Sequence, residues 1–176
     1  LESVIDRVRP AVMTIRVEGR DGDQLGIGTG FVVDPSGLIA TNFHVINEGR
    51  PFTIETSSGE KLDVLSIEAS DVANDLALIR VEAGDKTLAS LKLADNDSAD
   101  QGMRVLAFGN PHGMTGSVVE GIVSAKQMVE GRELLQLAMP IEPGNSGGPL
   151  VDMDGRVHGM INMKSAIDDN LGFAIP

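Results

Sequence analysis

The stretch EPGNSGGPLVD, residues 142–152, surrounds one serine, Ser146, with three glycines and two prolines. Glycine is used where the main chain must turn with positive φ or approach another atom closely. A serine in this setting is either part of an ordinary turn or a nucleophile. Its hydroxyl attacks a carbonyl only if an imidazole takes the proton and a carboxylate fixes the tautomer of that imidazole. The sequence must therefore supply a histidine and an aspartate.

Three histidines could act as the base. His44 lies in IATNFHVIN, directly after an apolar strand and before an expected turn of helix. His112 lies in the loop GNPHGM and is typical of an exposed loop residue, whereas His158 lies inside the strand GRVHGM and is typical of a strand side chain. The position of His44 favours it as the base.

Asp75 is favoured as the carboxylate partner. It opens NDLALIRV, where an acid stands beside a continuous apolar run and should be partly buried. A buried charge needs a partner. Asp71, in ASDVAND, has a more polar setting and is the second choice. Each residue alone would fit a structural role, but the three types together indicate nucleophilic catalysis.

Composition limits the fold and the classes of partner. The chain has 176 residues, of which 41% are apolar, so it can bury a core as one domain or as two small halves. Its 21 glycines predict many tight turns. The net charge of −12 argues against a nucleic acid or an anionic membrane as partner, because both reward clustered Lys and Arg.

No cofactor or metal is expected. The chain has no cysteine, which excludes disulfides, thiolate chemistry and zinc sites of the Cys type. The stretch DMDG, residues 152–155, resembles the start of a calcium loop, but no Glu follows at the required distance, so it predicts a hairpin turn. No apolar run approaches the roughly 18 residues of a membrane span.

The hydrophobic pattern predicts an all-β chain after one short helix. Apolar residues recur at helical spacing over residues 1–8, and Pro10 should end that helix. From residue 13 onward the period is two, in about a dozen short runs with turn signals between them. The runs at 61–69 and 75–82 each slip phase, which predicts a bulge or a sharp coil in both, as where a sheet curls into a barrel.

The most polar stretch, LADNDSADQG at residues 93–102, predicts a boundary between two halves. We therefore expect one unit over residues 1–95 and another over 96–176, with about six strands in each.

TNFHV, NDLALIRV and GNSGGPLV, in that order, resemble the His, Asp and Ser blocks of trypsin-like serine proteases, and more narrowly the HtrA/Deg family. The match extends to VIDRVRPAVMTI, GTGFVVDPSGLIATNFHVI, LAFGNPHGM, VVEGIVSA and LGFAIP. This resemblance implies two six-stranded antiparallel β-barrels with the active site in the cleft between them. His44 and Asp75 would come from the first barrel and Ser146 from the second.

The resemblance also implies a role for each residue. Ser146 would be the nucleophile, His44 the general base and then acid, and Asp75 the group that orients His44. The oxyanion hole is assigned to Gly144, Asn145 and Ser146, with the N–H groups of Gly144 and Ser146 pointing at the developing charge.

The substrate pocket is also assigned by resemblance. In trypsin-like folds the residue six before the nucleophile forms the base of this pocket, and an acid there selects Lys or Arg. Here that residue is Pro140, flanked by Met139 and Ile141, and Met160 and Met163 would add flexible thioethers if they line the same site. Cleavage after medium-sized aliphatic residues is therefore expected.

The sequence departs from the family pattern in several places. Asn145 stands where digestive proteases have an Asp that pairs with a freshly cut N-terminus, so activation by zymogen cleavage is not supported. The loops at 17–26 and 126–134 are short, which argues against control through them. Family members commonly carry PDZ domains after the closing strand, and this chain is expected to contain none. Glu142 is close enough in sequence to reach the pocket mouth.

The leading hypothesis is an endopeptidase of unfolded or misfolded proteins, located outside the cytoplasm and most simply in a bacterial periplasm. The resemblance further implies a homo-oligomer, with a trimer as the expected form. Two alternatives stay open. One is a peptide-binding module with a protease fold but no turnover, and the other is an esterase-like hydrolase of small acyl substrates.

Overall fold

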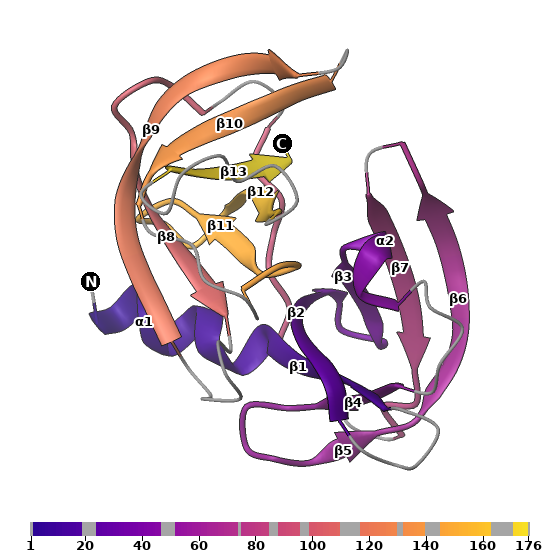
Figure 1. Cartoon of the computed structure of the whole chain (residues 1–176). Helices are drawn as coiled ribbons and strands as arrows, with labels where there is room; N and C mark the ends of the chain where they lie inside the picture. Colours follow the sequence, from indigo (N-terminus) through magenta and orange to yellow (C-terminus); the bar gives the residue numbers. More distant parts are fainter. Residues whose placement is uncertain are drawn as a thin grey trace.

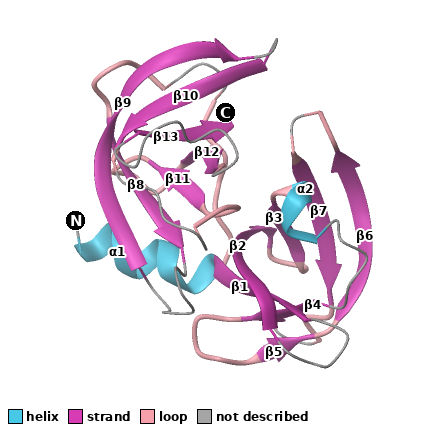
Figure 2. Cartoon of the chain, viewed as in Figure 1, coloured by secondary structure: helices cyan, strands magenta, loops and turns pink. Residues whose placement is uncertain are grey.

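The chain folds into two antiparallel β-sheets that lie side by side, with a short helix near the N-terminus (Figures 1 and 2). A computed structural model describes residues 2–18, 24–46, 52–73, 75–84, 88–95, 99–109, 117–129, 132–139, 145–162 and 171–175. The predicted two-barrel fold of the trypsin-like type is confirmed. Of the helices in these ranges, none is long and apolar enough to cross a membrane.

The first sheet has seven strands in the order β5-β4-β1-β2-β3-β7-β6. They are β1 (Val12–Glu18), β2 (Gln24–Asp34), β3 (Leu38–Thr41), β4 (Phe52–Glu55), β5 (Lys61–Leu62), β6 (Val64–Asp71) and β7 (Leu76–Val81). One turn of helix, α2 (Phe43–Ile46), follows β3. Ile15, Ile39, Ile54 and Ile79 are fully buried and form the centre of the core on one side of this sheet.

The second sheet is a closed six-stranded barrel in the order β10-β13-β12-β11-β8-β9. Its strands are β8 (Arg104–Gly109), β9 (Ser117–Val129), β10 (Arg132–Ala138), β11 (Pro149–Val151), β12 (Val157–Ile161) and β13 (Leu171–Ile175). The last strand of the first sheet ends at Val81 and the barrel begins at Arg104, while the exact boundary near residue 95 stays a prediction.

The predicted N-terminal helix is present as α1 (Glu2–Val8), followed by a 3-10 turn, η1 (Arg9–Ala11), that contains Pro10. Val4 and Val8 are buried in the core cluster that also contains Val151 and Val157 of the barrel. The end of α1 lies near the turn between β11 and β12, since a Cβ on Gly155 would lie 3.7 Å from Cγ2 of Val8, and η1 then leads directly into β1 of the first sheet (Figure 1).

The phase slip predicted for residues 61–69 is confirmed. The run splits at Asp63 into β5 and β6, which raises the strand count of the first sheet from six to seven. Strand β6 also shifts register against β7 twice, between Val64 and Ser66 and between Ile67 and Ala69. Such extra residues bend a strand and increase its twist, as the curl of the sheet requires.

The slip predicted for residues 75–82 is wrong. Strand β7 pairs with β3 in one continuous register, and its buried residues alternate regularly as Ala77, Ile79 and Val81. Leu76 and Leu78 lie on the opposite face and are half-buried. Apolar residues on the second face of β7 are therefore partly covered, and apolar residues on two faces of one strand give a sequence pattern that resembles a shift in phase.

Asp152 organises the turn between β11 and β12. Its Oδ1 accepts the backbone N–H groups of Asp154 at 2.9 Å and Arg156 at 3.1 Å, and its Oδ2 lies 2.7 Å from Nε2 of His158. Burial by itself raises the pKa of Asp152, but the hydrogen bonds from His158 and the two N–H groups outweigh it, so the pKa lies below its usual value. The hairpin turn predicted for DMDG and the strand position of His158 are confirmed.

We expect Asp152→Asn to lower the free energy of unfolding by about 1–2 kcal/mol at neutral pH, because charged hydrogen bonds are lost. The folded pKa lies below the value of about 3.9 in an unfolded chain. The stabilisation is therefore present above pH ~4 and is lost as the pH falls through the folded pKa. Urea unfolding of both proteins should show the difference shrinking in acid. An equal difference at neutral and strongly acidic pH would contradict this account.

Candidate active site

His44 and Asp75 are brought together at one end of the first sheet. Strands β3 and β7 are neighbours, with Thr41 opposite Ala77, so the turn of helix after β3 meets the turn before β7. Nδ1 of His44 lies 2.5 Å from Oδ2 of Asp75, and the backbone N–H of His44 donates to Oδ1 of Asp75 at 2.7 Å. Both carboxylate oxygens therefore face the same histidine.

This contact defines which nitrogen of His44 can act as a base. An ionised carboxylate only accepts hydrogen bonds, so the proton of a neutral imidazole must lie on Nδ1 when Nδ1 contacts Asp75. The lone pair of Nε2 is then free to accept a proton from a nucleophile. The side chain of His44 is 27% exposed and that of Asp75 only 7%, so the base is accessible while its carboxylate is shielded.

The backbone of Asp75 is also held. Its φ is 55°, in the left-handed region that Asp and Asn enter more readily than most residues. Its carbonyl accepts the N–H of Phe43 at 3.0 Å and Nδ2 of Asn42 at 3.1 Å, while its own N–H donates to the carbonyl of Val72 at 3.2 Å. The carboxylate is thus oriented by contacts at both ends of the residue.

Ser146 lies in the turn before β11 and is 6% exposed. Its carbonyl accepts the N–H of Thr29 at 2.9 Å, and the hydroxyl of Thr41 donates to the carbonyl of Thr29 at 2.8 Å. Thr41 is three residues before His44. The turn that carries Ser146 is therefore attached to the two strands of the first sheet that lead to the histidine.

The close contact between the Ser146 turn and Thr29 requires glycine at position 147. Gly147 has φ of 91°, and a Cβ at this position would lie 1.9 Å from the carbonyl oxygen of Thr29. A Cβ on Gly148 would lie 1.9 Å from the carbonyl oxygen of Phe108 in β8. A side chain at either glycine would push the turn that carries Ser146 away from its neighbours.

Asn145, the residue before the serine, is 3% exposed and packs against the end of β8. A Cβ on Gly109 would lie 2.2 Å from its Oδ1. Gly144, the other proposed oxyanion residue, lies outside the described residues, as do Pro140, Ile141 and Met163 of the predicted substrate pocket. The oxyanion assignment therefore stays a prediction.

The two described methionines of the predicted pocket lie in different core clusters. Met139 is buried in the barrel core, where a Cβ on Gly121 would lie 2.7 Å from its Cε. Met160, on β12, is buried between the sheets, with its Sδ 3.2 Å from Nδ2 of Asn42. A shared role of these residues in binding the substrate stays a prediction.

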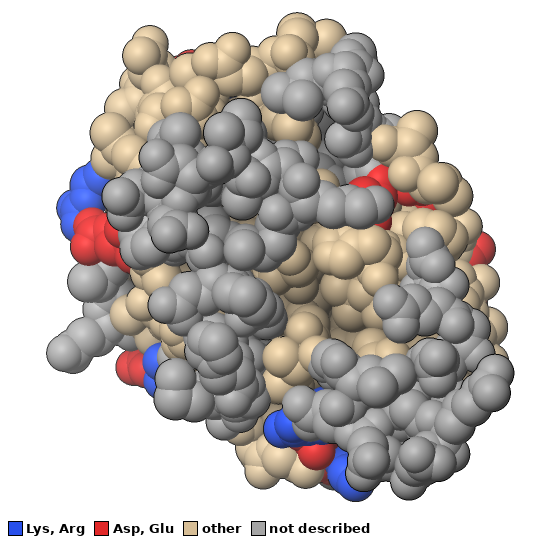
Figure 3. Space-filling view, viewed as in Figure 1, with Lys and Arg blue, Asp and Glu red and all other residues tan. Residues whose placement is uncertain are grey.

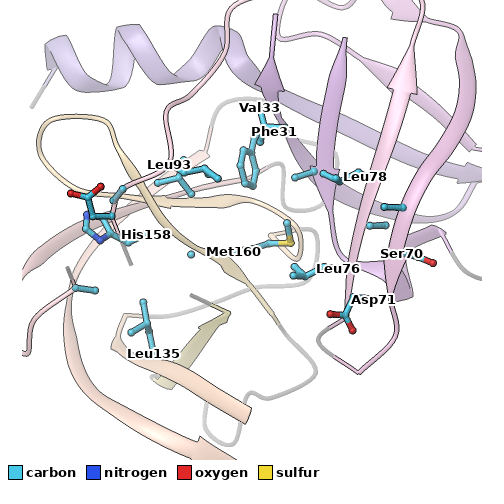
Figure 4. Close-up of a pocket in the computed structure, with 18 of the residues that line it drawn as sticks. Phe31, Val33, Ser70, Asp71, Leu76, Leu78, Leu93, Leu135, His158 and Met160 are labelled. Atoms are coloured by element: carbon cyan, nitrogen blue, oxygen red, sulfur yellow. The ribbon is translucent and has the colours of Figure 1, made fainter. Parts of the chain in front are cut away.

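A largely apolar cavity of about 750 Å³ lies between the two sheets. Figure 4 shows Phe31, Val33, Leu76 and Leu78 on the side of the first sheet and Leu135 and Met160 on the side of the barrel. Figure 3, drawn from the same side as Figure 1, shows uncharged residues along the hollow between the two sheets. Among the described residues, His44, Asp75 and Ser146 do not line this cavity, although Leu76 directly follows Asp75.

Sequence reasoning missed Asn42, Thr29 and Thr41, which connect the proposed catalytic residues. All three are fully buried polar side chains. The available signal was the polar pair at positions 41 and 42, which interrupts an apolar run just before His44.

Comparison with known proteins agrees with this geometry. The family described as trypsin-like peptidase domain matches residues 28–160. A probable periplasmic serine endoprotease DegP-like protein of Pseudomonas fulva is 38% identical over 90% of this chain and 34% of its own length. The mitochondrial serine protease HTRA2 of Bos taurus is 34% identical over 100% of this chain and 40% of its own length.

The chain thus spans between a third and two fifths of the length of these two relatives. Their similarity confirms the resemblance to HtrA/Deg proteases that the His, Asp and Ser blocks indicate. With the family match covering the segment from β2 to β12, the chain belongs to the trypsin-like peptidase domain family.

Proposed function

We propose that this domain is a serine endopeptidase that cleaves unfolded or misfolded proteins through an acyl-enzyme intermediate. The observation that carries the proposal is the contact of both Asp75 carboxylate oxygens with His44, at 2.5 and 2.7 Å. This geometry keeps the proton on Nδ1 and presents Nε2 as a base. The attachment of the Ser146 turn to Thr29, beside the strand that leads to His44, supports Ser146 as the nucleophile.

In the proposed reaction the Oγ of Ser146 attacks the scissile carbonyl while its proton passes to Nε2 of His44. Asp75 stabilises the imidazolium that forms. The negative charge that develops on the substrate oxygen is assigned to the N–H groups of Gly144 and Ser146. His44 then gives the proton to the leaving amine, and a water activated by the same nitrogen hydrolyses the acyl ester and restores the serine.

The names of the relatives support a location outside the cytoplasm. The Pseudomonas fulva protein is named periplasmic, whereas the Bos taurus protein is named mitochondrial. We propose an extracytoplasmic location, in the periplasm if the source is bacterial. Assembly into a homo-oligomer stays a prediction.

Labelling with a fluorophosphonate probe, followed by digestion of unfolded casein, tests the proposed activity. We expect the probe to label Ser146 and casein to be degraded, because the base activates the serine towards both phosphorus and carbonyl centres. Absence of labelling would contradict catalysis and favour the peptide-binding module. Labelling without cleavage of casein would contradict the endopeptidase and favour a hydrolase of small acyl substrates.

The released peptides also test the proposed specificity for Val, Ala, Leu or Ile before the cut bond. Pro140, Met139 and Ile141 offer no negative charge to the expected pocket, and a buried Lys or Arg without a partner would cost several kcal/mol. Mass spectrometry should therefore find most cuts after aliphatic residues. A majority after Lys or Arg would overturn this specificity and point to Glu142 as an acid in the pocket.

A further inference from the structure

We infer that Asn42 is a positioning residue for catalysis, which holds Asp75 in the orientation that it needs to contact His44. This inference rests on the proposed function, because Asn42 acts through Asp75 and not on the substrate. Asn42 is fully buried and lies between β3 and α2, two residues before His44. Its amide nitrogen donates to the backbone carbonyl of Asp75 at 3.1 Å.

The conformation of Asp75 explains why such a contact is needed. A left-handed backbone is unfavourable for any residue with a Cβ, and φ of Asp75 is 55°. Both oxygens of its carboxylate contact His44. The backbone is held at its N–H, which donates to the carbonyl of Val72, and at its carbonyl, which accepts from Asn42 and from the N–H of Phe43. Of these two donors, only Asn42 uses a side chain.

Chemistry determines which end of the Asn42 amide faces Asp75. The carbonyl of Asp75 only accepts, so the reversed amide would place two acceptor oxygens together. In the orientation observed, Nδ2 also lies 3.2 Å from Sδ of Met160 in the barrel. The Asn42 amide therefore lies between Asp75 and β12, and links the turn of the first sheet to the second sheet.

The amide oxygen of Asn42 indicates that this residue is not explained by packing alone. Its Oδ1 is buried and finds no hydrogen-bond partner among the described residues. A buried acceptor without a partner is unfavourable for folding, and a leucine of similar shape would avoid that cost. The hydrogen bond from the amide nitrogen of Asn42 to the Asp75 carbonyl therefore explains why an amide occupies this position.

The test replaces Asn42 by Leu, which keeps a branched shape and removes the donor. We expect kcat to fall roughly 10- to 100-fold, as for a small displacement of a catalytic group, with KM changed less than about twofold. Thr14→Val is the matched control, since Thr14 is also a buried polar residue of the first sheet and lies in β1. It should leave kcat unchanged. A folded Asn42→Leu protein with the kcat of the wild type would overturn the inference.

A double-mutant cycle separates positioning from a general loss of structure. If Asn42 acts through Asp75, Asn42→Leu should reduce kcat little further in an Asp75→Asn background. The far-downfield NMR resonance of the His44 Nδ1 proton should also weaken in Asn42→Leu and persist in Thr14→Val. Losses that multiply in the cycle, or an unchanged resonance, would overturn the inference.

Two further measurements keep the outcome clear. If Asn42→Leu does not fold, the isosteric Asn42→Asp serves instead, and it should lose at least as much kcat because its carboxylate faces the Asp75 carbonyl without a donor. An unchanged kcat in that protein would also overturn the inference. Ser146→Ala, measured in parallel, distinguishes failure of the inference from failure of the proposed function. Turnover retained in Ser146→Ala would contradict the proposed function itself. Loss of turnover in Ser146→Ala together with full activity in the Asn42 variants would contradict only the positioning role of Asn42.

Discussion

Ser146→Ala should lower kcat by about 10⁶ and leave the fold intact. The hydroxyl is the proposed attacking atom, so its removal ends the covalent route and leaves only what binding and the oxyanion hole contribute. The fold should survive because the contact of this residue with Thr29 uses its backbone. The Ser146 carbonyl accepts the N–H of Thr29, and alanine retains that carbonyl.

Casein turnover, fluorophosphonate labelling and the thermal unfolding midpoint measure this prediction together. Ser36→Ala is a suitable control, because Ser36 is an exposed serine in the turn between β2 and β3, far in sequence from the glycine-rich stretch. It should retain labelling and turnover. Proteolysis that persists in a Ser146→Ala preparation free of contaminating protease would end the assignment of the nucleophile.

The pairing of His44 with Asp75 could be predicted from sequence because its causes are local. An acid next to the apolar run 76–81 is partly buried, and a buried carboxylate needs a donor. A histidine directly after an apolar strand can supply that donor if the two strands are neighbours. The structure places β3 beside β7, and the contact follows.

The contacts that hold His44 and Asp75 in place could not be predicted from the sequence, because they depend on the conformation of the backbone. The positive φ of Asp75 has no sequence signature, since aspartate occurs in many turns with negative φ. The bond from Asn42 to the Asp75 carbonyl joins residues 33 positions apart and needs the register of two strands to be known. Sequence periodicity carries no information about which carbonyl such an amide will reach.

Strand β7 shows a second limit of sequence patterns. Leu76 and Leu78 break the alternation of apolar and polar residues along this strand, and a bulge is the explanation that the sequence alone suggests. The actual cause is tertiary, because these leucines line the cavity between the sheets while Ile79 packs in the core. The partial burial of this second face can be predicted only when the position of the barrel relative to the first sheet is known.

Asp75→Asn should lower kcat by about 10⁴ with the fold preserved. The carboxylate offers two acceptor oxygens, one to the backbone N–H and one to Nδ1 of His44. An amide has one acceptor oxygen. If that oxygen keeps the backbone N–H, the NH₂ group faces Nδ1 and stabilises the tautomer whose proton lies on Nε2. Nε2 then cannot take the proton from Ser146.

Asp71→Asn is the matched control for this substitution and decides between the two carboxylates. Asp71 is exposed at the end of β6, opposite Leu76 in the β6–β7 pair, whereas Asp75 is 5% exposed. A change at Asp71 should therefore leave kcat within a few-fold of the wild type, and casein turnover of both proteins measures the ranking. If Asp71→Asn lost more activity than Asp75→Asn, the contact with His44 would be structural and the orienting acid would have to be sought on β6.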